Sequence, residues 1–171
     1  ATMTLANLTT IYNDGSDIAN HTEGHVNLTA VSTADATTAI INCQNYLKAN
    51  GFTRAIGHLS YPNGATNESV KVLLASLQFK TARTVDKRLQ STVHGSYDPY
   101  ALRTFSLDDT LTLAQAKTHV DEAIISGQTV GFYGHKLEAA AGTLTWAIAD
   151  FQALIDYIAI RVNWGALDAV T

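Results

Sequence analysis

The sequence predicts an α/β protein with a mainly parallel sheet or barrel. Three observations support this class: amphipathic segments at helical spacing, short apolar runs between them, and glycine or polar residues that separate the two. The chain has 171 residues, of which 46% are hydrophobic and 15% charged, a composition typical of a globular chain. Strands that alternate with helices imply βα units. We expect one domain over residues 1–171.

Five amphipathic segments are expected to be helices. Between residues 33 and 50, apolar side chains recur at helical spacing, and Gly51 follows as a stop. Asn67 and Thr112 are residue types that cap helix N-termini. The expected helices are residues 5–12, residues 33–50, one after Asn67, one between Thr112 and Gly127, and one that opens at Thr145.

Six short apolar runs between these helices are expected to be buried strands. In parallel α/β folds, functional groups gather at the carboxyl ends of the strands, where the loops begin. Polar clusters that directly follow a strand are therefore the first candidates for a site. The expected strands are residues 17–20, 53–60, 79–83, 101–107, 129–134 and 167–170.

Composition also excludes several classes of protein. No apolar run reaches the ~18 residues of a membrane-spanning helix, and the start has neither the basic nor the apolar region of a signal peptide. The single Cys43 excludes an internal disulfide framework. A net charge of −4 without a basic patch argues against nucleic acid as a partner.

The densest polar cluster is Asn20-His21-Thr22-Glu23-Gly24-His25, directly after an expected strand. Neutral imidazoles are the commonest metal ligands in proteins, and zinc accepts them. Two histidines four residues apart can converge on one ion if they lie on a helical turn or a tight loop. The alternative is a pair of solvated loop histidines.

A second cluster, Tyr61-Pro62-Asn63-Gly64, also follows an expected strand. Pro62 fixes its own φ and Gly64 permits positive φ, so the loop backbone is held in a defined shape. Such a loop can present a backbone N–H to a developing oxyanion. The alternative is an ordinary turn.

The third candidate is His135, at the end of the apolar run Val130-Gly131-Phe132-Tyr133-Gly134. A histidine at the carboxyl end of a strand, near a metal, could act as general acid for a leaving group. The alternative is a purely structural residue.

These three clusters, in this order, resemble motifs of the NodB-type polysaccharide deacetylases, the family 4 carbohydrate esterases. Residues 15–29 resemble the segment around the family's His-Ser/Thr-x-x-His motif, and Tyr61-Pro62-Asn63-Gly64 resembles its Tyr-Pro-x-Gly segment. Residues 131–135 are similar to the late Leu-x-x-His motif. The end of the chain resembles the last helix and strand of the family, so the resemblance spans essentially the whole sequence.

The resemblance implies a distorted (β/α) barrel that binds a divalent metal, usually zinc, through one aspartate and two histidines. The histidines would be His21 and His25. The backbone N–H of Asn63 would meet the oxyanion, and His135 would protonate the departing amine. The turn formed by Tyr61, Pro62 and Gly64 would contact the substrate, an N-acetylated or O-acetylated polysaccharide.

The sequence departs from the family in its acidic residues. The family's Thr-Phe-Asp-Asp motif, which supplies the catalytic base and the metal-binding aspartate, has no match before His21, and Asp14 is a poor substitute by position. The family's arginine two residues before the motif proline is Ser60 here. The aspartate that tunes the late histidine has three candidates in the sequence: Asp98, Asp108 and Asp109.

We therefore expect the C-terminal portion of a deacetylase barrel that is incomplete on its N-terminal side, because a full barrel of this kind has about 250 residues. Exposed strand edges predict that an upstream segment or another chain covers it, for example in a homo-oligomer. The substrate class implies an extracellular location or one on a surface such as that of a virion. The alternative is a glycan-binding or structural module that kept the barrel and lost the chemistry.

Overall fold

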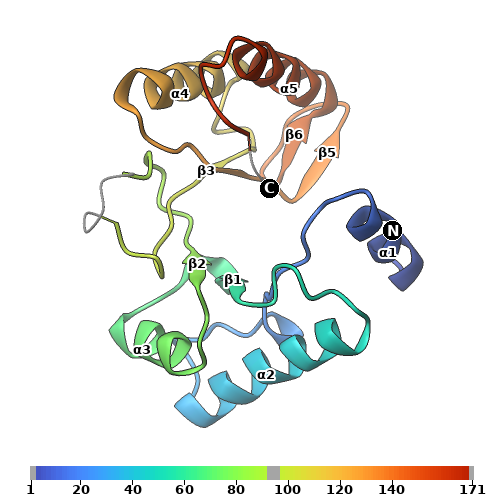
Figure 1. The fold of residues 1–171 in the computed structure, drawn as a ribbon, viewed down its shortest axis with the longest axis vertical. Coiled ribbons are helices and arrows are strands. Elements are labelled where there is room, and N and C mark those ends of the chain that lie inside the picture. Colours follow the sequence, from blue (N-terminus) through green and yellow to red (C-terminus); the bar gives the residue numbers. More distant parts are fainter. Residues whose placement is uncertain (1–2, 92–96, 170–171) are drawn as a thin grey trace. The chain divides into compact units, whose positions relative to one another are not determined.

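The computed structural model describes residues 3–91 and 97–169. They form a mixed α/β structure, which confirms the expected class (Figure 1). Contacts divide these residues into two compact units, the first comprising residues 3–84 and 99–102 and the second residues 85–91, 97–98 and 103–169. A single deacetylase-like domain, the closed barrel and its incompleteness stay predictions.

Each helix of the first unit begins at a short polar side chain that satisfies an exposed backbone N–H. Asn67, the expected cap, accepts a hydrogen bond from the Val70 N–H at 3.0 Å. Thr4 and Ser32 cap the other two helices in the same way. The three helices are α1 (Leu5–Asn13), α2 (Thr33–Ala49) and α3 (Glu68–Ser76).

The strands of the first unit form a parallel array. Strand β1 (His58–Ser60) pairs with β2 (Thr81–Arg83), with Ser60 opposite Arg83. Asn20 bridges to Leu59 on the outer side of β1, in the parallel direction. Helices α2 and α3 lie on one side of the β1–β2 pair (Figure 1). Their apolar faces and the two strands share one core, with Leu28, Ala36, Ile40, Leu59, Tyr61, Val70, Leu74, Phe79 and Ala82 buried.

A short returning segment, residues 99–102, completes this array on the far side of β2. The Ala82 N–H donates to the Pro99 carbonyl at 2.8 Å, and the Leu102 N–H donates to the Ala82 carbonyl at 2.9 Å. The Thr84 N–H then donates to the Leu102 carbonyl at 2.8 Å. The first unit is therefore built from two stretches of chain that are separate in the sequence.

The second unit contains two helices and four strands. Helix α4 (Leu113–Ser126) begins at a capping box between Thr112 and Gln115 and ends at Gly127, whose φ of 64° is the left-handed conformation that glycine adopts easily. Strand β3 (Phe105–Ser106) pairs in parallel with β4 (Phe132–Tyr133). The remaining elements are β5 (Lys136–Glu138), its parallel partner β6 (Thr145–Ala147), and helix α5 (Ile148–Asn163).

Trp146 is the largest fully buried side chain of the second unit, with 1% of its surface exposed. Its indole N–H donates to the Leu111 carbonyl at 2.8 Å, in the loop that leads into α4. The same side chain packs in the core formed by Phe105, Leu107, Leu111, Ala116, Val120 and Leu154. Trp146 thus ties strand β6 both to the core and to the start of α4.

Five of the expected strands are shorter than predicted, and three of them lie in the first unit. Only Asn20 of residues 17–20 is paired, β1 covers the last three residues of 53–60, and β2 covers the last three of 79–83. The Thr53 and Arg54 N–H groups both donate to the Tyr12 hydroxyl at 3.1 Å, and the Arg54 side chain binds Asp17 and the Tyr12 and Ser16 carbonyls. Hydrogen bonds to the Tyr12 hydroxyl and from the Arg54 side chain thus take the place of strand pairing around residues 17 and 53–54.

The other corrections fall in the second unit. Of residues 101–107 only Leu102 is bridged and β3 covers residues 105–106, while β4 covers residues 132–133 of the run 129–134. The prediction that a helix opens at Thr145 is wrong, because Thr145–Ala147 pairs with β5 and α5 begins at Ile148. Residues 167–169 form no strand, and Val170 lies outside the described residues.

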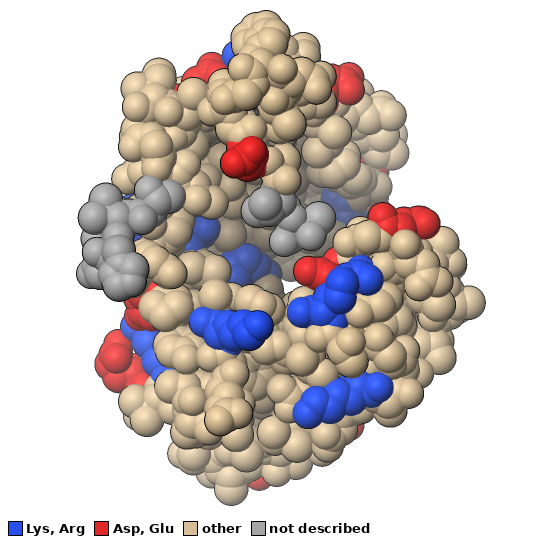
Figure 2. Space-filling model, in the orientation of Figure 1, with Lys and Arg blue, Asp and Glu red and all other residues tan. Residues whose placement is uncertain are grey.

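Charged side chains are sparse on the surface. Figure 2 shows a mostly uncharged face with single cationic and anionic side chains scattered over it, in keeping with the charged fraction of 15%. Among the helices that the structure describes, none combines the length and hydropathy needed to cross a bilayer.

The buried indole of Trp146 generates a stability prediction. Trp146→Phe leaves the Leu111 carbonyl without its donor and opens a cavity, so the free energy of unfolding should fall by about 2 kcal/mol. Trp164→Phe is the matched control, because Trp164 is 72% exposed, and it should change stability by less than about 0.5 kcal/mol. Urea denaturation followed by circular dichroism measures both, and equal effects would contradict the role of Trp146.

Candidate functional site

The two histidines of the first cluster lie side by side. Glu23–His25 forms a single 3₁₀ turn after Asn20, and the rings of His21 and His25 meet edge to face with their centroids 4.8 Å apart. Both side chains are exposed. The two rings are therefore in contact, as the spacing of four residues allows, while their convergence on one ion stays a prediction.

The hydrogen bond of His21 fixes which ring nitrogen can bind a ligand. Its Nδ1 lies 2.7 Å from the main-chain carbonyl oxygen of Ser60, at the end of β1. Because a carbonyl oxygen can only accept, Nδ1 carries the proton, and the lone pair of the neutral ring is on Nε2. Metal-binding histidines commonly donate their second ring N–H to a carbonyl in this way, so the His21 ring has the chemistry of one ligand of a divalent metal.

The second cluster forms a tight turn beside the same strand end. Pro62–Gly64 is a 3₁₀ turn in which Asn63 has a φ of 57°. The Gly64 N–H donates to the Tyr61 carbonyl at 2.9 Å, whereas none of the hydrogen bonds among the described residues uses the Asn63 N–H. Asn63 is exposed, so its N–H is available to an acceptor from solvent or substrate.

Tyr61 and Pro62 hold this turn rather than face solvent. The Tyr61 side chain is 1% exposed, and its hydroxyl donates to the Tyr100 carbonyl at 2.9 Å. Pro62 is also fully buried. A contribution of this turn to substrate binding would therefore come from its backbone and from Gly64, while Tyr61 and Pro62 set its position.

Arg83 is a residue of this edge that the sequence did not indicate. Its Nε donates to the Ser60 hydroxyl at 2.8 Å, and one of its terminal nitrogens donates to the Thr84 carbonyl at 3.1 Å. Ser60 stands where the resembling family has an arginine, so a guanidinium reaches this position from the neighbouring strand. The two side chains meet because Ser60 of β1 lies opposite Arg83 of β2. No pattern in the sequence indicates this pairing.

The acidic residues near the N-terminus have other partners. Asp14 is the residue at the C-terminal end of α1, Asp17 forms an ion pair with Arg54, and Glu23 accepts a hydrogen bond from Asn42. Within residues 3–91 and 97–169, no three His, Cys, Asp or Glu side chains converge as a metal site would require. The described residues thus bring two histidines together and place no third such side chain with them.

His135 follows β4 in the second unit, as expected for a residue at the carboxyl end of a strand. It is exposed, and its ring lies 6.0 Å from the ring of Tyr133, centroid to centroid. Strand β4 pairs with β3 so that Ser106 lies opposite Tyr133. Extending this register by two residues places Asp108 at the same strand edge as His135.

Three aspartates were candidates for the partner of His135. Of these, Asp108 is the one that the pairing of β3 with β4 places at the same strand edge as His135. Its carboxylate accepts hydrogen bonds from the Ser106 hydroxyl and from the N–H and hydroxyl of Thr110. Partial burial raises the pKa of Asp108, but these hydrogen bonds outweigh it and hold the pKa below its usual value. Asp109 is exposed and its N–H donates to the Gly142 carbonyl, and Asp98 lies half-buried before the returning segment.

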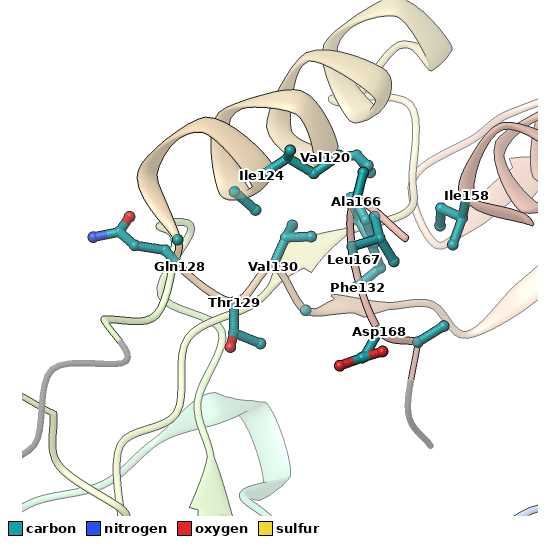
Figure 3. Close-up of a pocket in the computed structure, with 14 residues that line it drawn as sticks. Val120, Ile124, Gln128, Thr129, Val130, Phe132, Ile158, Ala166, Leu167 and Asp168 are labelled. Carbon is teal, nitrogen blue, oxygen red and sulfur yellow. The ribbon is translucent and has the colours of Figure 1, made fainter. Parts of the chain in front are cut away.

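A pocket of about 520 Å³ lies elsewhere in the second unit. It is lined by the second half of α4, residues 128–132 and residues 166–169 (Figure 3). In Figure 3 the side chains of Ile124, Val130 and Leu167 lie around the same space. The pocket adjoins the start of β4, whereas His135 follows its end, so none of the predicted site residues lines it.

The segment that matches known proteins contains both histidines and the turn. The sequence model of the polysaccharide deacetylases matches residues 2–82, a segment that contains His21, His25 and Tyr61-Pro62-Asn63-Gly64. Residues 2–82, just under half of the chain, are thus similar to the polysaccharide deacetylases. His135 lies outside the matched segment.

One solved structure is similar to this chain in its fold. It is the Streptococcus pyogenes deacetylase PplD in complex with acetate, with a TM-score of 0.55, 24% sequence identity and 61% of this chain covered. The chain spans 45% of the length of that protein. No match is found among curated proteins.

The lowered pKa of Asp108 predicts how stability depends on pH. A carboxyl group whose pKa is depressed on folding stabilises the protein above its unfolded pKa, and this stabilisation is lost as the pH falls through the folded pKa. Asp108→Asn should lower the free energy of unfolding at neutral pH by about 1 kcal/mol and should reduce the acid-induced loss of stability.

Urea denaturation between about pH 3 and pH 7 measures this dependence. The control is Asp109→Asn, next in the chain, whose carboxylate takes none of the hydrogen bonds described for Asp108. An Asp108→Asn profile that runs parallel to the wild-type profile would contradict the prediction.

Proposed function

We propose that this protein removes acetyl groups from an N-acetylated, or O-acetylated, polysaccharide by metal-dependent hydrolysis. The observation that carries the proposal is the histidine pair, with Nδ1 of His21 bonded to the Ser60 carbonyl and the ring of His25 against that of His21. The family match over residues 2–82 supports the same chemistry.

In this proposal His21 and His25 hold a divalent metal, with zinc as the first choice because it accepts imidazole readily. When bound, such a metal polarises the acetyl carbonyl and activates a water molecule. The Ser60 carbonyl keeps His21 in the tautomer whose Nε2 can coordinate.

Two further groups act on the substrate directly. The Asn63 N–H, which none of the described hydrogen bonds uses, donates to the oxyanion that forms on the acetyl oxygen. His135 is the proton donor to the departing amine, the role that the family resemblance implies. Tyr61, Pro62 and Gly64 shape the turn that receives the acetyl group.

The third metal ligand and the catalytic base would be aspartates of a strand upstream of residue 1. This chain alone would then be inactive, or only weakly active. Because acetylated glycans of this class occur there, we propose a location outside the cell or on a surface such as that of a virion.

The test is acetate release from a panel of N-acetylated and O-acetylated glycans by the zinc-loaded protein with its upstream strand. We expect release, an activity at background in His21→Gln, and a loss of about 100-fold or more in His135→Ala. His119→Gln on α4, a histidine that pairs with Glu122, is the matched control and should retain activity. An inactive wild-type protein on the whole panel would contradict the proposal.

A second candidate is a glycan-binding module that lacks catalysis, and one observation favours it. No carboxylate joins the histidine pair within the described residues. In this case glycan binding should survive His21→Ala and His25→Ala, and no acetate should be released. Binding that is lost in both variants, together with acetate release by the wild type, favours the enzyme.

The proposal also includes a covering partner, either an upstream segment or another chain. Large apolar side chains on and after α5 support it, since Ile155 is 46% and Trp164 72% exposed. The 171-residue chain should therefore self-associate in sedimentation experiments. A stable monomer at high protein concentration would contradict this part of the proposal.

A further inference from the structure

Asn20 is a polar residue with no solvent exposure, directly before His21. A buried amide is destabilising unless its donor and acceptor groups are both hydrogen-bonded. Every hydrogen-bonding group of Asn20 has a partner, and these partners come from three different parts of the first unit.

The backbone of Asn20 joins strand β1. Its N–H donates to the His58 carbonyl at 3.0 Å, and its carbonyl accepts from the Ser60 N–H at 2.9 Å. The side-chain NH₂ group donates to the Ile40 carbonyl of α2 at 2.9 Å. Strand and helix thus fix both the position of Asn20 and the rotation of its amide.

The remaining group, the side-chain oxygen of Asn20, accepts a hydrogen bond from the Thr22 N–H at 2.9 Å. Thr22 has a φ of 63° and a ψ of 153°, a region that β-branched residues avoid and that costs about 1–3 kcal/mol. Such a conformation persists only where several contacts enforce it. The second contact is the Thr22 hydroxyl, which accepts from the Val26 N–H at 2.8 Å.

We infer that Asn20 is a positioning residue for the histidine pair, because its buried amide holds the backbone of Thr22 in the strained conformation that brings His21 and His25 together. His21 precedes Thr22 and His25 follows it by three residues, so a change in the Thr22 backbone moves one ring relative to the other. The part of this inference that concerns metal binding rests on the proposed function.

The chemistry of the position requires an amide. One end must donate to the Ile40 carbonyl and the other must accept from Thr22, which only a side chain with both groups can do. An aspartate at this position keeps the acceptor but turns a second oxygen toward the Ile40 carbonyl. A serine is too short to reach both partners.

The experiment compares Asn20→Asp and Asn20→Ser with Val70→Ala. Val70 on α3 is buried in the core of the first unit. Its side chain forms no hydrogen bond to the turn that carries His21 and His25. Two quantities are measured on the 171-residue chain: the Kd for zinc, and the hydrogen-exchange rate of the Thr22 amide by NMR. Thermal unfolding shows that each variant is folded.

We expect the two Asn20 variants to bind zinc at least about tenfold more weakly and to exchange the Thr22 amide faster. Val70→Ala should lower the thermal midpoint, yet keep the zinc Kd within about twofold and the Thr22 amide protected. Wild-type affinity and protection in a folded Asn20→Asp variant would overturn the inference. An equal loss of zinc affinity in Val70→Ala would overturn it too.

Two further outcomes separate this inference from the proposed function. If the wild-type chain does not bind zinc, the proposed metal site fails, while hydrogen exchange at Thr22 still decides the role of Asn20. If neither Asn20 variant folds, the wild type alone tests the inference. Its Thr22 amide should then exchange as slowly as the Ser60 amide of β1. An unprotected Thr22 amide in the wild type would overturn the inference.

Discussion

The pairing of Asn20 with strand β1 is the constraint on which the candidate site depends. Two backbone hydrogen bonds place the residue before His21 beside the last residues of β1, and the Ser60 carbonyl at that strand end then receives the His21 ring. The Pro62–Gly64 turn begins two residues after the end of this strand. One short parallel pairing therefore sets the relative positions of the histidines and of the Asn63 N–H.

Helices were predictable here because their signals are local. Asn67 and Thr112 cap the helices expected of them, and Gly127 ends α4. Strand limits were less predictable, since pairing depends on which partner each backbone group finds. The Tyr12 hydroxyl takes the N–H groups of residues 53 and 54, an interaction between distant segments that no local pattern indicates. Residues 145–147 likewise form a strand because β5 lies beside them.

The candidate site, too, was predictable only where its signals are local. The spacing of His21 and His25 predicts that their rings can meet, and the residue types at positions 61–64 predict a rigid turn. The contact between His21 and the Ser60 carbonyl could not be predicted, nor could the approach of Arg83 to the Ser60 hydroxyl. Both depend on the register between strands, which the chain acquires only when it folds. The carboxylate that the family pattern requires has no counterpart beside the histidines in the described residues.

The returning segment at residues 99–102 has a practical consequence for dividing this protein into fragments. The family match stops at residue 82, which invites a boundary there, yet Ala82 exchanges backbone hydrogen bonds with Pro99 and Leu102. A fragment cut after residue 84 would leave the outer edge of β2 without its neighbour and open to pairing with other copies. A soluble fragment that carries the histidine pair should therefore extend through residue 102.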